Sequence, residues 1–490
     1  MKKNTQHQGR VDLKAIKNSE QLINGLFKKF LHAISPKMSR RCLGTATVLA
    51  VISVNVGGGG GLGSLNKVYA ADIGLTDSGE IITLYDVTNG PSVGVFIDSN
   101  NHEYKVGSTT GSYTSGDTFK LTNGDITLSA NDKTNLGGIY TNDRTLNFDF
   151  GTKTVSVTNT KTDAVLTWGF GYASNSSFSG TLSATSSSSI SVSSSSGQAF
   201  GLVFKSAMTQ SAGFAELSNA KIDLSGTTIK VENSDNSGNN GEAYGFAAGN
   251  LTGNTTIKLG DIESVLAGQG NKIRGFVAGN VLESSSIELK NVTAQSNTDG
   301  KSKDVIAVEL KDIQGKVTQT GTITAYGQGS AATDSAIGFS AQTIMPFTSQ
   351  VTLNAVNVTE IDYGNAVGVS IVRNEGIFAV DAITVTAANN ATGFKVSNSN
   401  VNNLTLQSID ATATLGNAIG LSLGDFNANT LGSAAAGTII LGGDITATSD
   451  NGGSAIGIYA GQLAGIDVSN KIFATTAATD DTTKAAYGIW

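Results

Sequence analysis

The stretch Ala243-Tyr244-Gly245-Phe246 decides how this chain folds, because its pattern returns along most of the sequence. Each copy has a small or apolar residue, a variable residue, a glycine and then a large apolar residue. From Gly245 to Gly488 the period is near 31 residues, which is typical of solenoid proteins. The glycine and apolar residues that define the repeat are Gly245, Phe246, Gly275, Phe276, Gly338, Phe339, Gly368, Val369, Gly393, Phe394, Gly420, Leu421, Gly457 and Ile458.

A second pattern lies inside each period and has the form apolar-x-apolar-x-x-apolar, as in Ile257, Leu259 and Ile262. Alternation at i and i+2 places two side chains on one face of a strand. The extra residue before the third apolar position predicts a bend or bulge where the chain turns a corner. Stacked coils of two or three short strands would bury these residues. We therefore predict an all-β parallel β-solenoid, or β-helix, with coils of about 31 residues.

This fold predicts an interior column made by the large apolar residue of every copy. One weaker copy has Ala307 in place of glycine and places Val308 in the column. The glycine is expected to permit close backbone packing or a positive φ. Earlier copies end at Val95, Ile139, Phe170 and Leu202. The steps from Gly94 to Gly138 and from Gly201 to Gly245 each span 44 residues.

The repeat divides the chain into three regions: 1–70, an irregular solenoid start and cap at 71–197, and the regular solenoid at 198–490. The serine run 186–196 is either a flexible link or a polar-faced strand, and its alternation around Ile190 and Val192 favours the strand. Residues 486–490 are a further copy cut off inside a period. Because repeat proteins need a polar terminal cap, we expect a C-terminally truncated solenoid.

Residues 1–70 are predicted to be a signal peptide with an extended basic region. An apolar stretch at 43–56 follows the basic residues, and Val68-Tyr69-Ala70 provides the small residues that signal peptidase accepts. Cleavage is expected after Ala70 or one residue later, which would remove Cys42, the single cysteine. A membrane anchor is the alternative, but the apolar stretch is shorter than the roughly 20 residues that a spanning helix needs.

With its long basic leader and β-solenoid body, the chain resembles autotransporter (type V secretion) passengers and surface adhesins with a right-handed parallel β-helix, and also pectin-lyase-like β-solenoids. The resemblance is one of layout and architecture over roughly residues 90–490. It implies export through the inner membrane of a Gram-negative bacterium to the cell surface, the outer membrane or the extracellular space. It also implies an outer-membrane translocator, which this sequence does not encode.

Charge and residue types argue against most catalytic chemistry. Residues 1–70 hold 11 of the 32 basic and 2 of the 39 acidic residues, so the body carries 37 acidic and 21 basic residues. A body with a net charge of −16 argues against nucleic acid as a partner. His102 is the single histidine after the leader, in a turn, and the G-x-G-x-x-G match at Gly58 lies in a glycine run. No cofactor or metal is expected.

Six aspartates near the apolar strand motifs are the candidates for a carboxylate-based glycosidase site. They share no common offset within the repeat, so no catalytic cluster is predicted. They are Asp223, Asp261, Asp312, Asp381, Asp410 and Asp444.

The leading hypothesis is a non-enzymatic surface protein that acts in adhesion or aggregation. Its partners would be extracellular or host surface components, or other copies of itself. The alternatives are a secreted β-helix enzyme that degrades polysaccharide and a self-assembling surface-layer or matrix component. Residues 427–436, in an enlarged late step, are expected to project as a loop and offer the best candidate contact site.

Overall fold

The computed structural model describes most of the chain from Asp72 onward. The described residues are 72–75, 84–88, 90–107, 109–122, 124–235, 241–268, 271–297, 304–328, 334–346, 348–401, 403–425, 430–431, 439–460, 466–468, 470–477 and 485–490. The chain divides into two compact units, Met1–Lys67 and Val68–Trp490, and every described residue belongs to the second. The predicted signal peptide lies outside the described residues. Within the described ranges, no helix is long and apolar enough to span a membrane.

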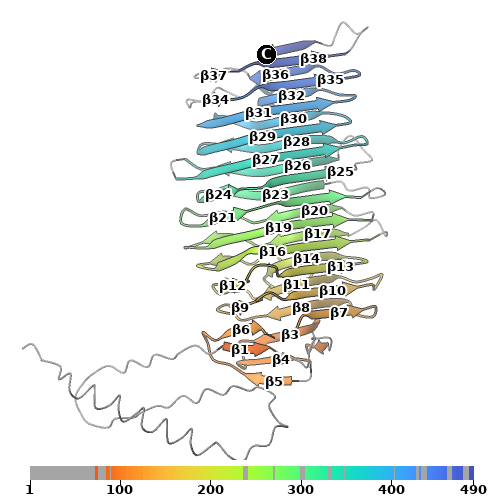
Figure 1. The fold of residues 1–490 in the computed structure, drawn as a ribbon, viewed down its shortest axis with the longest axis vertical. Coiled ribbons are helices and arrows are strands. Elements are labelled where there is room, and N and C mark those ends of the chain that lie inside the picture. The colour runs from red at the N-terminus through yellow and green to blue at the C-terminus, as the bar shows by residue number, and fades with distance from the viewer. Residues whose placement is uncertain are drawn as a thin grey trace, which may run out of the picture. The chain divides into compact units, whose positions relative to one another are not determined.

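Every named element is a β-strand, and most strands belong to two sheets that face each other across the core (Figure 1). The first sheet, of 20 strands, contains β1 (Asp72–Leu75), β6 (Thr118–Leu121), β7 (Ile126–Ala130), β9 (Asn147–Asp149), β10 (Thr154–Asn159), β12 (Thr181–Ser183), β13 (Ser189–Ser194), β16 (Lys221–Asn233), β19 (Thr256–Leu266), β21 (Ser286–Leu289), β22 (Val292–Ser296), β24 (Lys316–Gln319), β25 (Thr322–Gly327), β27 (Gln350–Glu360), β29 (Ile377–Ala387), β31 (Leu404–Ala413), β34 (Ile439–Leu441), β35 (Ile445–Ser449), β37 (Ile466–Val468) and β38 (Ile472–Thr476).

The second sheet carries the glycine motif. It contains β2 (Tyr85–Asp86), β3 (Ser92–Asp98), β4 (Glu103–Val106), β5 (Thr109–Ser112), β8 (Asn135–Thr141), β11 (Leu166–Ala173), β14 (Gln198–Lys205), β17 (Glu242–Ala247), β20 (Lys272–Val277), β23 (Asp304–Ile313), β26 (Ser335–Ile344), β28 (Asn365–Asn374), β30 (Ala391–Val401), β32 (Ala418–Asp425), β33 (Thr430–Leu431), β36 (Ala455–Ala460) and β39 (Ala486–Ile489). A small separate pair is formed by β15 (Leu217–Ser218) and β18 (Leu251–Thr252).

Parallel pairing between successive coils places the large apolar residue of each motif in one ladder. Phe246 is in register with Phe276, and their rings stack with centroids 4.8 Å apart. Every member except Ile489 is fully buried. The predicted parallel β-solenoid with turns of about 31 residues is confirmed. The ladder is Val95, Ile139, Phe170, Leu202, Phe246, Phe276, Val308, Phe339, Val369, Phe394, Leu421, Ile458 and Ile489.

The glycine before each column residue is required by close packing between coils. A Cβ on Gly245 would lie 2.2 Å from Ile262 Cγ2 and 2.6 Å from the carbonyl oxygen of Gly275. The other predicted reason, a positive φ, does not apply here, because the described residues with positive φ do not include these glycines. Ala243 and Phe246 are both in the main core, so the alternation of the strand is interrupted at Gly245.

The second sequence pattern forms three further ladders on the first sheet. Ile257 is in register with Ile287, Leu259 with Leu289, and Ile262 with Val292 in the next coil. The extra residue marks a bend, which separates β21 from β22 and β24 from β25 but is spanned by the longer strands β27, β29 and β31. Gln319 interrupts the middle ladder. Its buried side-chain amide donates to the carbonyl oxygen of Lys290 at 3.1 Å and accepts from the backbone N–H of Asn354 at 2.9 Å.

The first coil is closed by antiparallel strands that the repeat did not predict. β4 folds back on β3, and β5 folds back on β4. The rings of Tyr104 and Tyr113 then meet Phe119 edge-on, with centroids 5.6 and 5.1 Å apart. This hairpin accounts for the 44-residue step between Gly94 and Gly138, and its two tyrosines cover the ring of Phe119.

Parallel pairing continues from coil to coil across residue 197, where the sequence predicts a boundary between the irregular start and the regular solenoid. β13 pairs in parallel with β10 and with β16. Ile190 and Val192 are buried, and the serines that alternate with them, Ser189, Ser191 and Ser193, are half-buried on the opposite face. Residues 189–194 of the serine run are therefore the polar-faced strand. The second 44-residue step, from Gly201 to Gly245, contains residues 206–216, which we call the cover segment because it folds over the outside of the second sheet.

Candidate functional site

The groups considered for catalysis are dispersed over the surface. His102 lies in the turn between β3 and β4 at a φ of 51°, with its ring edge-on to Tyr113. The six aspartates lie on different coils: Asp223, Asp381, Asp410 and Asp444 are exposed, and Asp261 and Asp312 are half-buried. Among the described residues, no group of three or more His, Cys, Asp and Glu side chains is placed to hold a metal ion.

Several predicted features lie outside the described residues. These are the glycine run around Gly58 and most of the loop expected at 427–436. Of that loop the structure describes Thr430–Leu431, which form β33 and pair in antiparallel fashion with Gly424 and Asp425. Its predicted role as a contact site stays a prediction.

The outer face of the second sheet carries a row of aromatic side chains at the variable position of the motif. Trp168, Phe200 and Tyr244 occupy successive places in one ladder and are nearly fully buried. Phe200 stacks on Tyr244 with centroids 4.9 Å apart, and Phe214 of the cover segment meets both rings. These residues form a second hydrophobic cluster outside the main core. The cover segment therefore shields an apolar strip that would otherwise face solvent.

A lysine is buried beneath the same cover segment. Lys205 is 2% exposed, and its ammonium group donates to the carbonyl oxygen of Gln210 at 3.2 Å. Burial lowers the pKa of Lys205 to about 8, against the opposing attraction of Glu242. The Glu242 carboxylate accepts hydrogen bonds from Gln198 at 2.5 Å and from the Tyr244 hydroxyl at 2.9 Å. No described contact of Lys205 is a direct ion pair.

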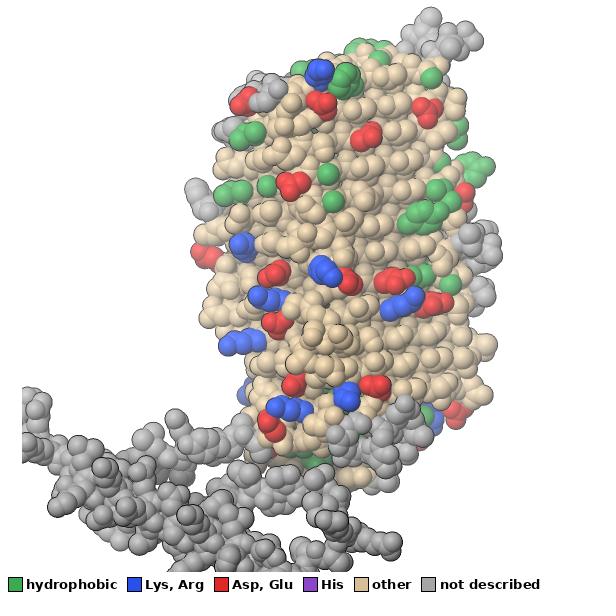
Figure 2. Space-filling model, in the orientation of Figure 1, with side chains coloured by type: hydrophobic (Ala, Val, Ile, Leu, Met, Phe, Trp, Pro, Cys, Tyr) green, Lys and Arg blue, Asp and Glu red, His purple; other side chains and the backbone are tan. Residues whose placement is uncertain are grey.

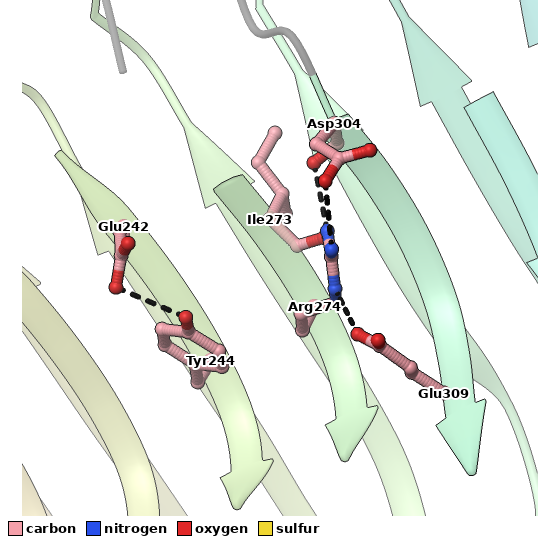
Figure 3. A network of polar contacts seen from close by, with 6 residues as sticks. All are labelled: Glu242, Tyr244, Ile273, Arg274, Asp304 and Glu309. Carbon is pink, nitrogen blue, oxygen red and sulfur yellow. Dashed lines mark hydrogen bonds and ion pairs between the residues drawn. The ribbon is translucent and has the colours of Figure 1, made fainter. Parts of the chain in front are cut away.

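The aromatic row ends in a buried arginine network, shown in Figure 3. Arg274 follows Tyr244 in the ladder and is 5% exposed. Its guanidinium donates to the Asp304 carboxylate at 3.0 Å, to the Asp304 carbonyl oxygen at 2.9 Å and to the Glu309 carboxylate. Burial acts to lower the pKa of Arg274, but the two carboxylates outweigh it and the pKa is raised. The network satisfies a buried charge with carboxylates from the next coil, which is a structural role.

Paired charges mark a limited part of the first sheet. Lys258 lies 3.4 Å from Glu288, and Lys290 lies 3.1 Å from Asp261. In the view of Figure 2, basic and acidic side chains are interspersed, and most of the surface is neither charged nor hydrophobic. Exposed pairs of this kind contribute little to stability.

Further along the first sheet, one threonine per coil faces outward at the same position. We call this row the threonine ladder. Its members are in register from coil to coil and alternate with buried residues such as Val385 and Ala411. Neighbouring strands are about 4.8 Å apart, so the hydroxyl and methyl groups repeat at that interval. The ladder consists of Thr359, Thr386, Thr412, Thr448 and Thr475.

An asparagine ladder marks one turn of the later coils. The side-chain oxygen of Asn365 accepts from the Asn390 side-chain amide at 2.8 Å. The Asn390 oxygen accepts from the backbone amide of Asn417 at 2.9 Å, and the Asn417 oxygen accepts from that of Ser454 at 2.8 Å. These bonds satisfy backbone groups at the turn and tie each coil to the next.

The sequence pattern did not single out Arg274, Lys205 or the aromatic row. A usable indication was present, because the variable position of the motif changes from Trp168, Phe200 and Tyr244 to Arg274 in successive copies. Large side chains at an outward position imply a covering segment. The 44-residue step that follows Gly201 supplies one.

Comparison with known proteins finds no counterpart: no family model, no curated protein and no solved structure matches this chain. The function must therefore be inferred from the surface of the solenoid itself.

Proposed function

We propose that this protein is an exported, surface-exposed rod that acts in adhesion or aggregation through repeated weak contacts along its sides. The observation that carries the proposal is the threonine ladder, with members such as Thr386, Thr412 and Thr448 in register on successive coils. An array of hydroxyl and methyl groups at about 4.8 Å intervals suits a partner that is itself repetitive. Many weak contacts then add up, because each bound position raises the effective concentration of the next.

The test is a settling assay with cells that display the full chain and have no other adhesin. We expect displaying cells to aggregate, and the double variant Thr386→Lys/Thr412→Lys to lose most of the settling. The matched control is Ser340→Lys/Ser370→Lys, two residues in register on the outer face of the second sheet. It adds the same charge and removes the same number of hydroxyls. Equal loss in both variants, or no settling by the parent, would contradict the proposal.

The export part of the proposal has its own measurement. Mass spectrometry of the surface-exposed protein should find a mature N-terminus at Ala71 or Asp72. Recovery of a chain with residues 1–70 intact would contradict the predicted signal peptide. A panel of polysaccharides tests the enzymatic alternative. If the protein cleaves any of them, and mutation of its own carboxylates abolishes the cleavage, the protein is an enzyme and the adhesive function is contradicted.

A further inference from the structure

The hairpin that closes the first coil also builds a hollow on the outside of the second sheet. Its volume is about 300 Å³, and the residues of its lining that matter here are Tyr85, Phe96, Asp98, Asn101, Glu103 and Lys105. That volume is at the lower end of the range of about 300–1,000 Å³ found for small-molecule sites. The hollow exists because of an insertion in the repeat, since β4 and β5 belong to the long step between Gly94 and Gly138.

Strand register gathers the lining side chains on one face. Phe96 is opposite Lys105, and Asp98 is opposite Glu103, across the antiparallel pair of β3 and β4. Val95 and Ile97, the neighbours of Phe96 along β3, point into the core and are fully buried. Because side chains alternate between the two faces of a strand, the side chains of Phe96, Asp98, Glu103 and Lys105 lie together on the outer face as two neighbouring pairs.

An aromatic wall flanks this patch. Tyr85 of β2 stacks on Phe96 with centroids 5.9 Å apart and an interplanar angle of 12°. Phe96 in turn stacks on Tyr140 of β8, with centroids 5.5 Å apart. Lys105 donates a hydrogen bond of 2.8 Å to the Tyr85 hydroxyl, which holds that ring at the edge of the hollow.

The acidic and amide groups on the other side are already oriented. The Asp98 carboxylate accepts hydrogen bonds from the side-chain amide of Asn142 and from that of Asn101, both at 2.9 Å. It also accepts from the backbone amide of Asn100 at 3.0 Å. Because a carboxylate offers about four acceptor positions, one remains for a ligand. Glu103, beside it, adds a second carboxylate, which is half-buried.

We propose that this hollow binds one uncharged sugar unit of a glycan. The ring of a pyranose has apolar C–H faces and an edge of hydroxyl groups, and the hollow offers an aromatic wall beside fixed carboxylate and amide groups. Two carboxylates against one ammonium group disfavour an anionic ligand such as a phosphate or a uronic acid. The site uses none of the threonine ladder, so the two proposals can succeed or fail separately.

The test uses the full chain on a panel of immobilised oligosaccharides, with the retained ligand then titrated by calorimetry. We expect neutral glycans to be retained over acidic ones. Glu103→Gln should weaken binding roughly tenfold, because it replaces a charged acceptor with a neutral one. Tyr85→Ala should weaken binding at least as much, while Tyr85→Phe, which keeps the ring face, stays within about threefold of the parent.

The control is Glu263→Gln, which removes a half-buried carboxylate of the first sheet, paired with Lys230 at 3.5 Å, and should leave binding unchanged. Circular dichroism checks that each variant is folded. If Tyr85→Ala does not fold, the affinity of Glu103→Gln for the glycan tests whether the hollow is the binding site. Absence of any retained neutral glycan would overturn the proposal. Binding that is equal in the parent, Tyr85→Ala and Glu103→Gln would do the same. Settling of displaying cells should be unaffected by Glu103→Gln unless the hollow, rather than the threonine ladder, causes aggregation.

Discussion

Replacing Gly338 by alanine tests the packing between coils with a single methyl group. A Cβ at this position would lie 2.3 Å from Val356 Cγ1 and 2.7 Å from the carbonyl oxygen of Gly368 in the next coil. Val356 cannot easily move its methyl group, because a β-branched side chain has few alternative rotamers. The carbonyl oxygen belongs to the backbone of the neighbouring coil. The added methyl group must therefore displace a valine or separate two coils.

The magnitude follows from two opposing effects. Overpacking of a well-packed interior costs roughly 1–3 kcal/mol. Alanine offsets part of this, because glycine loses more backbone entropy on folding by roughly 0.5–1 kcal/mol. Since one of the contacts is with backbone, we expect a net loss of about 2 kcal/mol in the free energy of unfolding. The row of motif glycines itself contains one tolerated methyl group, that of Ala307, which is fully buried.

Urea unfolding of the full chain, followed by circular dichroism, measures the effect. The matched control is Gly213→Ala in the cover segment, where a Cβ would meet no atom within 4 Å. That variant should unfold at the same urea concentration as the parent or a slightly higher one. If Gly338→Ala behaves like Gly213→Ala, close approach between coils is not the reason for glycine in the motif.

Four other variants probe the interior and the two buried cations. Phe339→Asp should lower the thermal unfolding temperature sharply, because it buries a carboxylate without a partner at a cost of several kcal/mol, and a normal unfolding temperature would contradict the register. Arg274→Met should leave the free energy of unfolding in urea nearly unchanged, because it removes the buried charge itself. Asp304→Ala/Glu309→Ala should lower that free energy by about 3 kcal/mol, because it leaves the guanidinium buried and unpaired. Equal effects of the two variants would contradict this reasoning. Lys205 has a pKa of about 8 in the folded protein and a higher ordinary value of 10.5, so the unfolded chain binds its proton more tightly and stability should rise with pH from about 8 towards 10.5. Lys205→Met should be more stable than the parent at pH 7 by about 2 kcal/mol and should lose that rise, and parallel curves for the two proteins between pH 7 and 9.5 would refute it.

The regular part of the fold could be predicted because its core is periodic. Each coil repeats the same contacts, so the spacing of Gly245 and Phe246 from Gly275 and Phe276 contains the register directly. The bend after Leu259 was also visible, as one extra residue in an alternating pattern.

The parts of the fold that could not be predicted lie where insertions interrupt the repeat. The hairpin of β3 to β5 and the cover segment are insertions, and their contacts are made with the outside of the coils rather than with the next repeat. The burial of Lys205 depends on Phe214 and Gln210 folding back over it, which no residue spacing encodes. The hairpin was closer to being predictable, since Asn100-Asn101 separates two short alternating segments in the manner of a turn.

The antiparallel hairpin at the start of the solenoid is also the place where folding can begin with the smallest loss of chain entropy. Pairing β3 with β4 closes a turn of only a few residues, whereas each parallel pairing of the glycine motif must close a chain segment of about 31 residues. Short-range pairs form in microseconds and with little loss of chain entropy. Once Tyr104 and Tyr113 are in place, Phe119 gains an apolar surface on which to settle, and each later coil finds an ordered edge beneath it. Folding of the solenoid would thus begin at its N-terminal hairpin and proceed towards the C-terminus, with each coil pairing onto the coil before it.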